Sequence, residues 1–200
     1  MHIEVARLIA RGARVLALAA IMIARAAAAD DDAVREYVDE ITAVSITVPV
    51  ESLLFARERT DLAANARDYI TLTPLEINRT GQRACYWFGY VWSTIDRRNR
   101  QPLLLEGDEL VLLADGRPIA LMMERRQLRD LGVGEPPTRP PVRGAVPVLF
   151  AATPEEIAYL ARAREVHVEL IRGGENETFP MWKDARDSVQ AFVDRVEAAR

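Results

Sequence analysis

The sequence contains little of the side-chain chemistry on which many catalytic and metal sites depend. Its 200 residues include one cysteine, Cys85, and two histidines, His2 and His167. One thiol and two imidazoles exclude zinc fingers, iron–sulfur centres and internal disulfide bonds within one chain. Lys183 is the sole lysine, and no P-loop, GxSxG, HExxH or GxGxxG motif occurs. The enzyme classes marked by those motifs are therefore excluded, and we expect no cofactor and no metal.

The first 29 residues have the three-part order of a cleavable export signal. Three arginines precede an apolar stretch at residues 15–24, and an A-x-A pattern ends at Ala29. The apolar stretch is much shorter than the roughly 20 residues that span a bilayer, so no stable membrane span is expected after cleavage. Abundant arginine and alanine suggest a GC-rich bacterial genome. This favours a periplasmic or secreted protein over the alternative, a mitochondrial presequence.

The chain is acidic. Its formal charge is −4, and loss of residues 1–29 would remove four arginines and one glutamate, leaving −7. Nucleic acids are bound through clustered positive charge, so this balance predicts no nucleic-acid partner. Two short arginine clusters, at residues 97–100 and 125–129, are typical of solvated faces, with contact to an anionic lipid or glycan as the alternative.

Residues 43–134 have the patterns of an antiparallel β-rich portion. Alternating apolar and polar residues predict a strand that ends at Pro49, because proline cannot donate to a sheet ladder. A second β segment is expected to break near Pro74. Asp115 and Gly116 lie between two apolar runs, which predicts a tight hairpin turn with positive φ angles.

The flanking segments differ in character. Residues 30–42 have helical spacing and predict a short helix or a flexible N-terminal segment. Residues 135–147 are proline-rich and predict a linker loop. Residues 148–200 predict a β-α-β-β-α portion, whose first helix begins with a capping box formed by Thr153 and Glu156. We therefore expect an α+β fold, an antiparallel sheet or sandwich-like core with this C-terminal portion packed on it.

The most distinctive segment is the aromatic run Cys85–Trp92. Alternation along a strand places four aromatic rings on one face, those of Tyr86, Phe88, Tyr90 and Trp92. The other face is apolar as well. Such a strand is either buried on both sides as core or presents a row of rings that binds a partner. If it binds, the expected residues are Tyr86, Tyr90, Trp92, Arg97 and Arg98.

Other titratable residues give weaker patterns. His167 lies between Glu165 and Glu169 on a strand, which is an incomplete metal set, and a surface histidine is the ordinary interpretation. Nothing in the spacing brings Cys85 to His167 as a nucleophile and base. We expect Cys85 to be a buried core residue.

A carboxylate pair across a cleft is the remaining enzymatic possibility. Glycoside hydrolysis needs two carboxyl groups about 5–9.5 Å apart. The candidates, which lie near strand ends beside the aromatic run, are Glu76, Asp96, Glu106, Asp108 and Glu109.

The sequence thus predicts an exported, non-enzymatic module that binds an envelope protein or glycan. A hydrolase that acts on polysaccharide through paired carboxylates is the alternative. A structural subunit of an envelope assembly is a third possibility, and the oligomeric state stays open.

Overall fold

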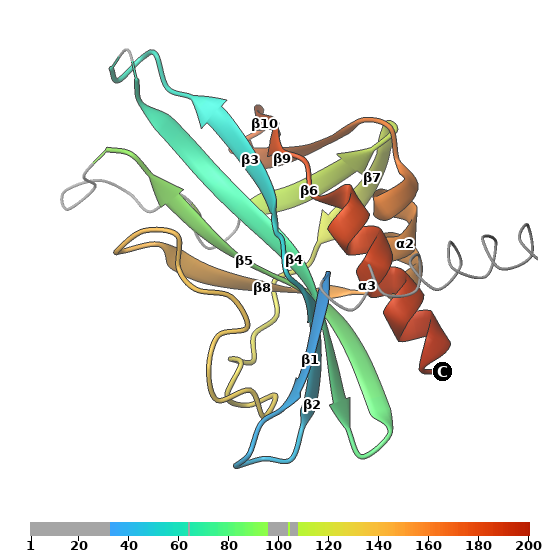
Figure 1. The fold of residues 1–200 in the computed structure, drawn as a ribbon. Helices are drawn as coiled ribbons and strands as arrows, with labels where there is room; N and C mark the ends of the chain where they lie inside the picture. Colours follow the sequence, from blue (N-terminus) through green and yellow to red (C-terminus); the bar gives the residue numbers. More distant parts are fainter. Residues whose placement is uncertain (1–32, 64, 96–103, 105–107) are drawn as a thin grey trace, which may run out of the picture.

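The computed structural model describes residues 33–63, 65–95, 104 and 108–200, and this part is an α+β fold built mostly of antiparallel sheet (Figure 1). The predicted class is confirmed. Its elements are β1 (Val34–Val38), β2 (Ser45–Pro49), β3 (Leu53–Glu58), β4 (Arg67–Arg79), β5 (Gln82–Ser93), β6 (Glu109–Ala114), β7 (Arg117–Leu121), β8 (Val146–Ala152), α2 (Pro154–Arg162), β9 (Val166–Arg172), β10 (Glu175–Lys183) and α3 (Arg186–Ala198).

The strands belong to a single sheet that closes on itself. Hydrogen-bonded neighbours follow the order β1-β2-β4-β3-β10-β9-β6-β7, while β5 pairs with β4 and β8 pairs with β5. Just past β7, Met123 forms a bridge with Phe150 of β8, and the Glu124 amide donates to the Leu149 carbonyl over 2.8 Å. β7 therefore meets β8, which closes the ring β4-β3-β10-β9-β6-β7-β8-β5, while β1 and β2 lie outside it. The inner side chains of the ring form one enclosed core.

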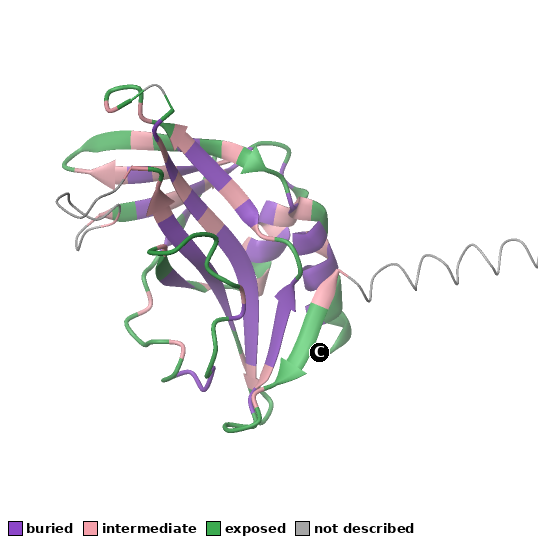
Figure 2. Ribbon diagram, turned by 60° about the vertical axis from the view of Figure 1, so that its left-hand side comes forward, coloured by how far each residue is buried: buried purple, intermediate pink, exposed green. Residues whose placement is uncertain are grey.

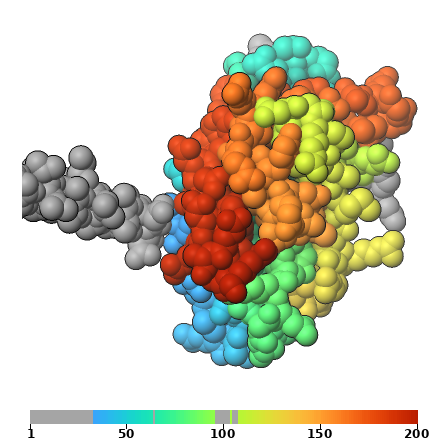
Figure 3. Space-filling model, turned by 90° about the vertical axis from the view of Figure 1, so that its right-hand side faces the viewer, coloured from blue at the N-terminus to red at the C-terminus, as the bar shows by residue number. Residues whose placement is uncertain are grey.

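The C-terminal strands are members of this sheet and do not form a layer over it. β8 pairs with β5 from Cys85 to Val91, and β10 places Met181 opposite Phe55 of β3. The β-α-β-β-α order is present, but covering of the enclosed core falls to the two helices. Figure 3 shows α2 and α3 side by side on one face of the molecule.

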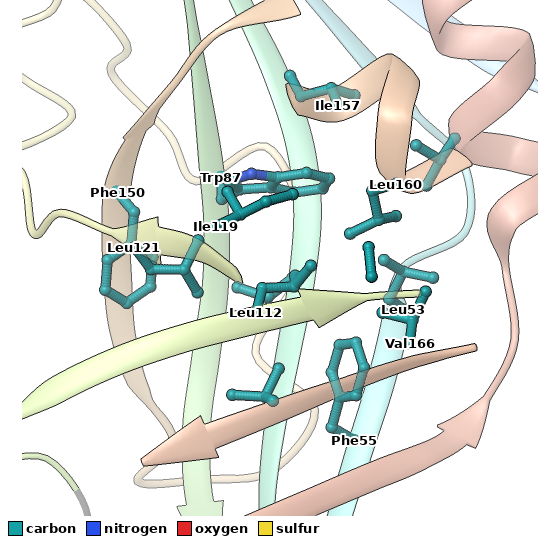
Figure 4. Close-up of a cluster of buried hydrophobic side chains, with 14 of the residues drawn as sticks. Leu53, Phe55, Trp87, Leu112, Ile119, Leu121, Phe150, Ile157, Leu160 and Val166 are labelled. Atoms are coloured by element: carbon teal, nitrogen blue, oxygen red, sulfur yellow. The ribbon is translucent and has the colours of Figure 1, made fainter. Parts of the chain in front are cut away.

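The enclosed core is filled by side chains from the inner face of the sheet and from the helices (Figure 4). Trp87 of β5 is fully buried and lies among Ile119, Phe150 and Ile157, which come from two other strands and from α2. Cys85 is buried in the same cluster, as expected. Burial of this apolar area at about 25 cal/mol per Å² supplies the main stabilisation of the fold.

A second apolar cluster lies on the outer face of β4 and β5. Residues 124–145 pass over this face, and Leu131 and Val133 of that segment are buried against the sheet residues Phe88 and Tyr90. Figure 2 shows the buried middle of the long strands between exposed strand ends and turns. The proline-rich residues therefore run along the surface of the sheet.

β4 runs without interruption through Pro74, so the predicted break there is wrong. The strand pairs with β3 up to Leu72 and with β2 from Glu76 onward. Pro74 lies between these two partners, where the missing proline N–H leaves no ladder hydrogen bond unmade. The switch of partner explains why a proline is tolerated inside a long strand.

The helix alternative for residues 30–42 is also wrong within the described residues. Val34–Val38 forms β1, which pairs antiparallel with β2. Backbone pairing with β2, the next strand in the chain, has overridden the helical spacing of the apolar residues.

Three predictions that rest on residues close together in the sequence are confirmed. β2 ends at Pro49. Asp115 and Gly116 turn between β6 and β7 with φ angles of 48° and 77°. Thr153 and Glu156 form the reciprocal capping box of α2.

Candidate functional site

Two of the predicted binding residues, Tyr86 and Tyr90, are covered. Their side chains are 5% and 4% exposed beneath residues 124–145. Arg126 Nη2 donates to the Tyr86 hydroxyl over 3.4 Å, and the Tyr90 hydroxyl donates to the Thr138 carbonyl over 2.8 Å. Burial raises the pKa of Tyr90. At these positions the aromatic strand follows the core alternative, and the hydroxyl groups hold the covering segment in place.

Trp92 packs against the same outer cluster as Tyr86 and Tyr90 and is half-buried. It is opposite Tyr69 of β4, and the two rings stack with centroids 5.0 Å apart and an interplanar angle of 13°. Offset stacking of this kind favours the pair beyond the area that it buries. Arg97 and Arg98, the predicted basic partners of this strand, lie outside the described residues.

A second aromatic group lies on the other side of β3. Trp182 of β10 is 57% exposed, and the guanidinium of Arg67 lies 4.9 Å from the centre of its ring. Arg67 also pairs with Glu58, with 3.0 Å between Nη2 and Oε1. This hydrogen bond to Glu58 is the main reason that the pKa of Arg67 is raised.

These groups form one strip across the outer face of the sheet. Tyr69 and Arg67 alternate with inward residues on β4, and their partners on β3 are Ala56 and Glu58. Because residues two apart share a strand face, Arg67 and Tyr69 point the same way. We call this set the outer aromatic strip; its members are Trp92, Tyr69, Arg67 and Trp182.

Sequence analysis missed most of this strip. In β10 the alternation that buries Phe179 implies an outward Trp182, so the sequence held one usable signal. Tyr69 and Arg67 gave none, because their importance depends on which strands lie beside β4.

Charged residues gather where β3 and β9 end and where β4 and β6 begin. Arg59 Nη1 lies 2.9 Å from Oδ2 of Asp68, a carboxylate with no exposed side-chain surface. Arg172 Nη2 lies 2.5 Å from Asp108 Oδ2. Arg57 forms an ion pair with Glu177. Each carboxylate of this group is thus held by a guanidinium, an arrangement that orders the strand ends.

The predicted catalytic carboxylates are not brought together in the described residues. Glu76 is 3% exposed, and Arg83 Nη1 lies 3.6 Å from its Oε1. Burial raises the pKa of Glu76. Glu76 is eight residues along β4 from Asp68, roughly 26 Å at 3.3 Å per residue. Asp108 lies at the Asp68 end, where Arg172 holds it.

The other three carboxylate candidates add no pair. Glu109 is exposed at the start of β6. Asp96 and Glu106 lie outside the described residues.

Cys85 and His167 do not form a reactive pair. Burial, followed by the nearby Glu76 carboxylate, raises the pKa of the Cys85 thiol to about 12. His167 lies on the outer face of β9, with Nε2 3.7 Å from Glu169 Oε1. The hollow beside Cys85, lined by Ile157 and Phe192, holds about 10 Å³, room for roughly one water molecule.

Among the described residues, no three His, Cys, Asp or Glu side chains are grouped so that they could hold a metal ion. No helix in the same residues has the length and apolar character needed to cross a membrane.

Comparison of the chain with protein-family models, with curated proteins and with solved structures finds no match in any of the three.

Proposed function

We propose that the chain is an exported, non-enzymatic module that binds a protein or glycan of the cell envelope through the outer aromatic strip. The observation that carries this proposal is the 57% exposure of Trp182 on a sheet face that also presents Arg67, Tyr69 and Trp92. Exposed rings that lie in a row mark surfaces where a partner covers apolar area.

The chemistry of the strip suits either class of partner. Arg67 lies over the Trp182 ring, and an indole can offer a second face to a sugar ring or to an apolar side chain. Tyr69 and Trp92 each cover one face of the other's ring. We therefore place the first contact with the partner at Trp182, at one end of the strip.

Binding without catalysis is supported by the state of the reactive groups. The thiol of Cys85 is buried and its pKa is raised to about 12, which disfavours the nucleophilic thiolate. The carboxylates at the strand ends are occupied by arginines. The export pattern of residues 1–29 supports a periplasmic or secreted location.

Binding to purified peptidoglycan and native mass spectrometry of the chain from its own cells test the proposal together. We expect a chain that begins at Asp30, and Trp182→Ala and Trp92→Ala variants that retain their fold but lose at least tenfold in binding to peptidoglycan or to a co-purifying envelope protein. Tyr37→Ala, at a residue 36% exposed on β1, is the matched control and should bind normally.

Two results contradict the proposal. Folded strip variants with unchanged binding would remove the strip as the site. A mature chain that still begins at Met1 would remove the envelope as the compartment.

A further inference from the structure

The strand β1 (Val34–Val38) lies at one end of the strand order and pairs with a neighbour on one side only. Figure 2 shows it as an exposed strand along the edge of the sheet. It keeps one register over its five residues and contains no proline, lysine or bulge. These are three devices that commonly block a free strand edge, so β1 is open to pairing.

The backbone groups of β1 alternate in direction. The Asp39 amide, just past the strand, donates to the Val44 carbonyl over 2.9 Å. In an antiparallel pair this places the N–H and C=O groups of odd-numbered residues toward β2. The groups that point away from β2 belong to Val34, Glu36 and Val38. Within the described residues, no hydrogen bond engages them, so the edge presents a row of free donors and acceptors.

The charges around this edge are close to balanced. Three arginines and four carboxylates lie on or beside β1 and its turn: Arg35, Arg79, Arg195, Glu36, Asp39, Glu40 and Glu135. Arg195 Nη2 lies 3.0 Å from Glu36 Oε2. Because neither sign dominates, the edge favours a partner surface that is itself of mixed charge over a strongly basic or strongly acidic one.

A second copy of the same edge is complementary to it in one register. In an antiparallel pair of copies centred on Tyr37, Arg35 of each copy lies opposite Asp39 of the other. Glu36 lies opposite Val38, and these two exchange their free backbone hydrogen bonds. The Arg35 and Asp39 side chains belong to a non-hydrogen-bonded pair, whose Cβ atoms are about 4.5–5.5 Å apart. Two ion pairs and one pair of tyrosine rings therefore form across the axis.

Neighbouring registers set like charges opposite one another. A pair centred on Glu36 places that carboxylate against itself, and a pair centred on Arg35 does the same with the guanidinium. A pair centred on Val38 places Glu36 opposite Glu40. Like charges directly opposite destabilise a strand pair, so the sequence of this edge selects the register centred on Tyr37.

Both members of the ion pair are already held at the edge. Arg35 Nη2 donates to the Pro137 carbonyl over 2.8 Å. The Gly134 amide donates to Asp39 Oδ2 over 2.8 Å, and this hydrogen bond is the main reason that the pKa of Asp39 is lowered. The carboxylate is therefore charged at neutral pH, and little side-chain freedom is left to lose on pairing.

We propose that two copies of the chain join through β1, antiparallel and centred on Tyr37, so that one sheet continues into the other across a two-fold axis. The contact covers Tyr37 and Val38, which are 36% and 56% exposed. The paired strands are short, so the dimer is weak and forms only at high protein concentration. The proposal uses no residue of the outer aromatic strip and does not depend on the binding function proposed for it.

Sedimentation velocity of the full chain between about 5 and about 500 µM measures the association. We expect a monomer at the lower end and a growing fraction of dimer toward the upper end. Glu36→Pro removes an N–H that points away from β2, so β1 is retained while the dimer loses two hydrogen bonds. Its dissociation constant should rise about 30-fold.

The matched control is Glu36→Ala. It also removes the ion pair with Arg195, but it keeps the backbone N–H. Its dissociation constant should stay within about threefold of the parent value. Both variants carry the same residues 1–32, so the difference between them reports on the strand edge.

Disulfide cross-linking tests the register. Tyr37→Cys places two thiols opposite each other in a non-hydrogen-bonded pair, where the Cβ spacing suits a disulfide. Copper-catalysed air oxidation at high protein concentration should therefore link two copies rapidly. Ile41→Cys is the control, because residue 41 is 92% exposed but lies four residues from the axis on each copy. It should give at most about a tenth of the linked product. The native Cys85 is buried.

Four outcomes overturn the proposal. They are a chain that stays monomeric up to about 500 µM, a dimer that Glu36→Pro leaves unchanged, equal weakening by Glu36→Pro and Glu36→Ala, and equal cross-linking of Tyr37→Cys and Ile41→Cys. Circular dichroism checks the fold of each variant. If Glu36→Pro does not fold, the two cysteine variants still decide between the register centred on Tyr37 and random contact.

Discussion

A Cβ atom on Gly89 would lie 1.8 Å from the carbonyl oxygen of Thr71 and 2.8 Å from its carbonyl carbon. Gly89 is in the middle of β5, and Thr71 is on the adjacent strand β4, so both atoms belong to the backbone of the sheet. The two long strands can approach this closely only because glycine has no side chain.

The first prediction concerns this contact. Gly89→Ala should lower the free energy of unfolding by about 3 kcal/mol, because a backbone clash cannot be relieved by a rotamer change. Urea unfolding followed by circular dichroism measures the loss. Gly144→Ala is the control: its φ is +87° with nothing near the new Cβ, so only about 1 kcal/mol of backbone strain is expected. Equal losses in the two variants would contradict the argument.

The second prediction concerns the pH dependence of stability through Glu76. Burial raises its pKa in the folded state above that of the unfolded chain. The folded state therefore binds the proton more tightly, and stability is lost as the pH rises from the unfolded pKa through the folded one. Glu76→Gln, which is neutral throughout, should be more stable than the parent chain at pH 8, with a difference that shrinks toward pH 4.

Urea titrations at several pH values measure this difference. Glu175→Gln, at an exposed residue of β10, is the control and should leave the pH profile unchanged. A Glu76→Gln variant less stable than the parent at pH 8 would mean that attraction to Arg83, 3.6 Å away, outweighs the cost of burial.

The third prediction concerns the reactivity of Cys85. With a pKa of about 12, only about one thiol in ten thousand is ionised at pH 8, and the side chain is buried as well. Iodoacetamide should leave the folded chain unmodified over hours, and should alkylate it within minutes in denaturant. Mass spectrometry counts the added group. Rapid alkylation of the folded chain would show that the thiol is accessible and ionised.

The fourth prediction concerns the start of α2. The Glu156 amide donates to Thr153 Oγ1 over 3.2 Å, and Glu156 Oε2 accepts from the Thr153 amide over 2.9 Å. Thr153→Ala should cost about 1 kcal/mol of stability. Thermal unfolding measures the change, with Thr60→Ala at an exposed loop position as the control. A loss no larger than that of the control would mean that packing alone fixes the helix start.

The features that could be predicted from sequence are those that depend on residues close together in the chain. Asp115 and Gly116 determine a turn by their own φ angles, and Thr153 and Glu156 complete one another across a single helical turn. The α+β class follows from the sum of such local patterns.

The features that could not be predicted depend on strand register. The stacking of Tyr69 on Trp92 follows from β4 lying beside β5 in one register, and a shift by one residue would point Trp92 into the core. Arg67 reaches Trp182 only because β10 returns beside β3. Val34–Val38 becomes a strand because β2 offers its edge. Apolar spacing within one segment carries no information about these neighbours.

The place of β10 beside β3 also has a consequence for when the molecule can form. These partners are separated by more than half of the chain, and the strands between them cannot enclose a core until the last strand is synthesised. Contacts of such long sequence separation slow folding. A nascent chain of this design therefore keeps the inner face of its sheet exposed to water until Glu175–Lys183 has been synthesised.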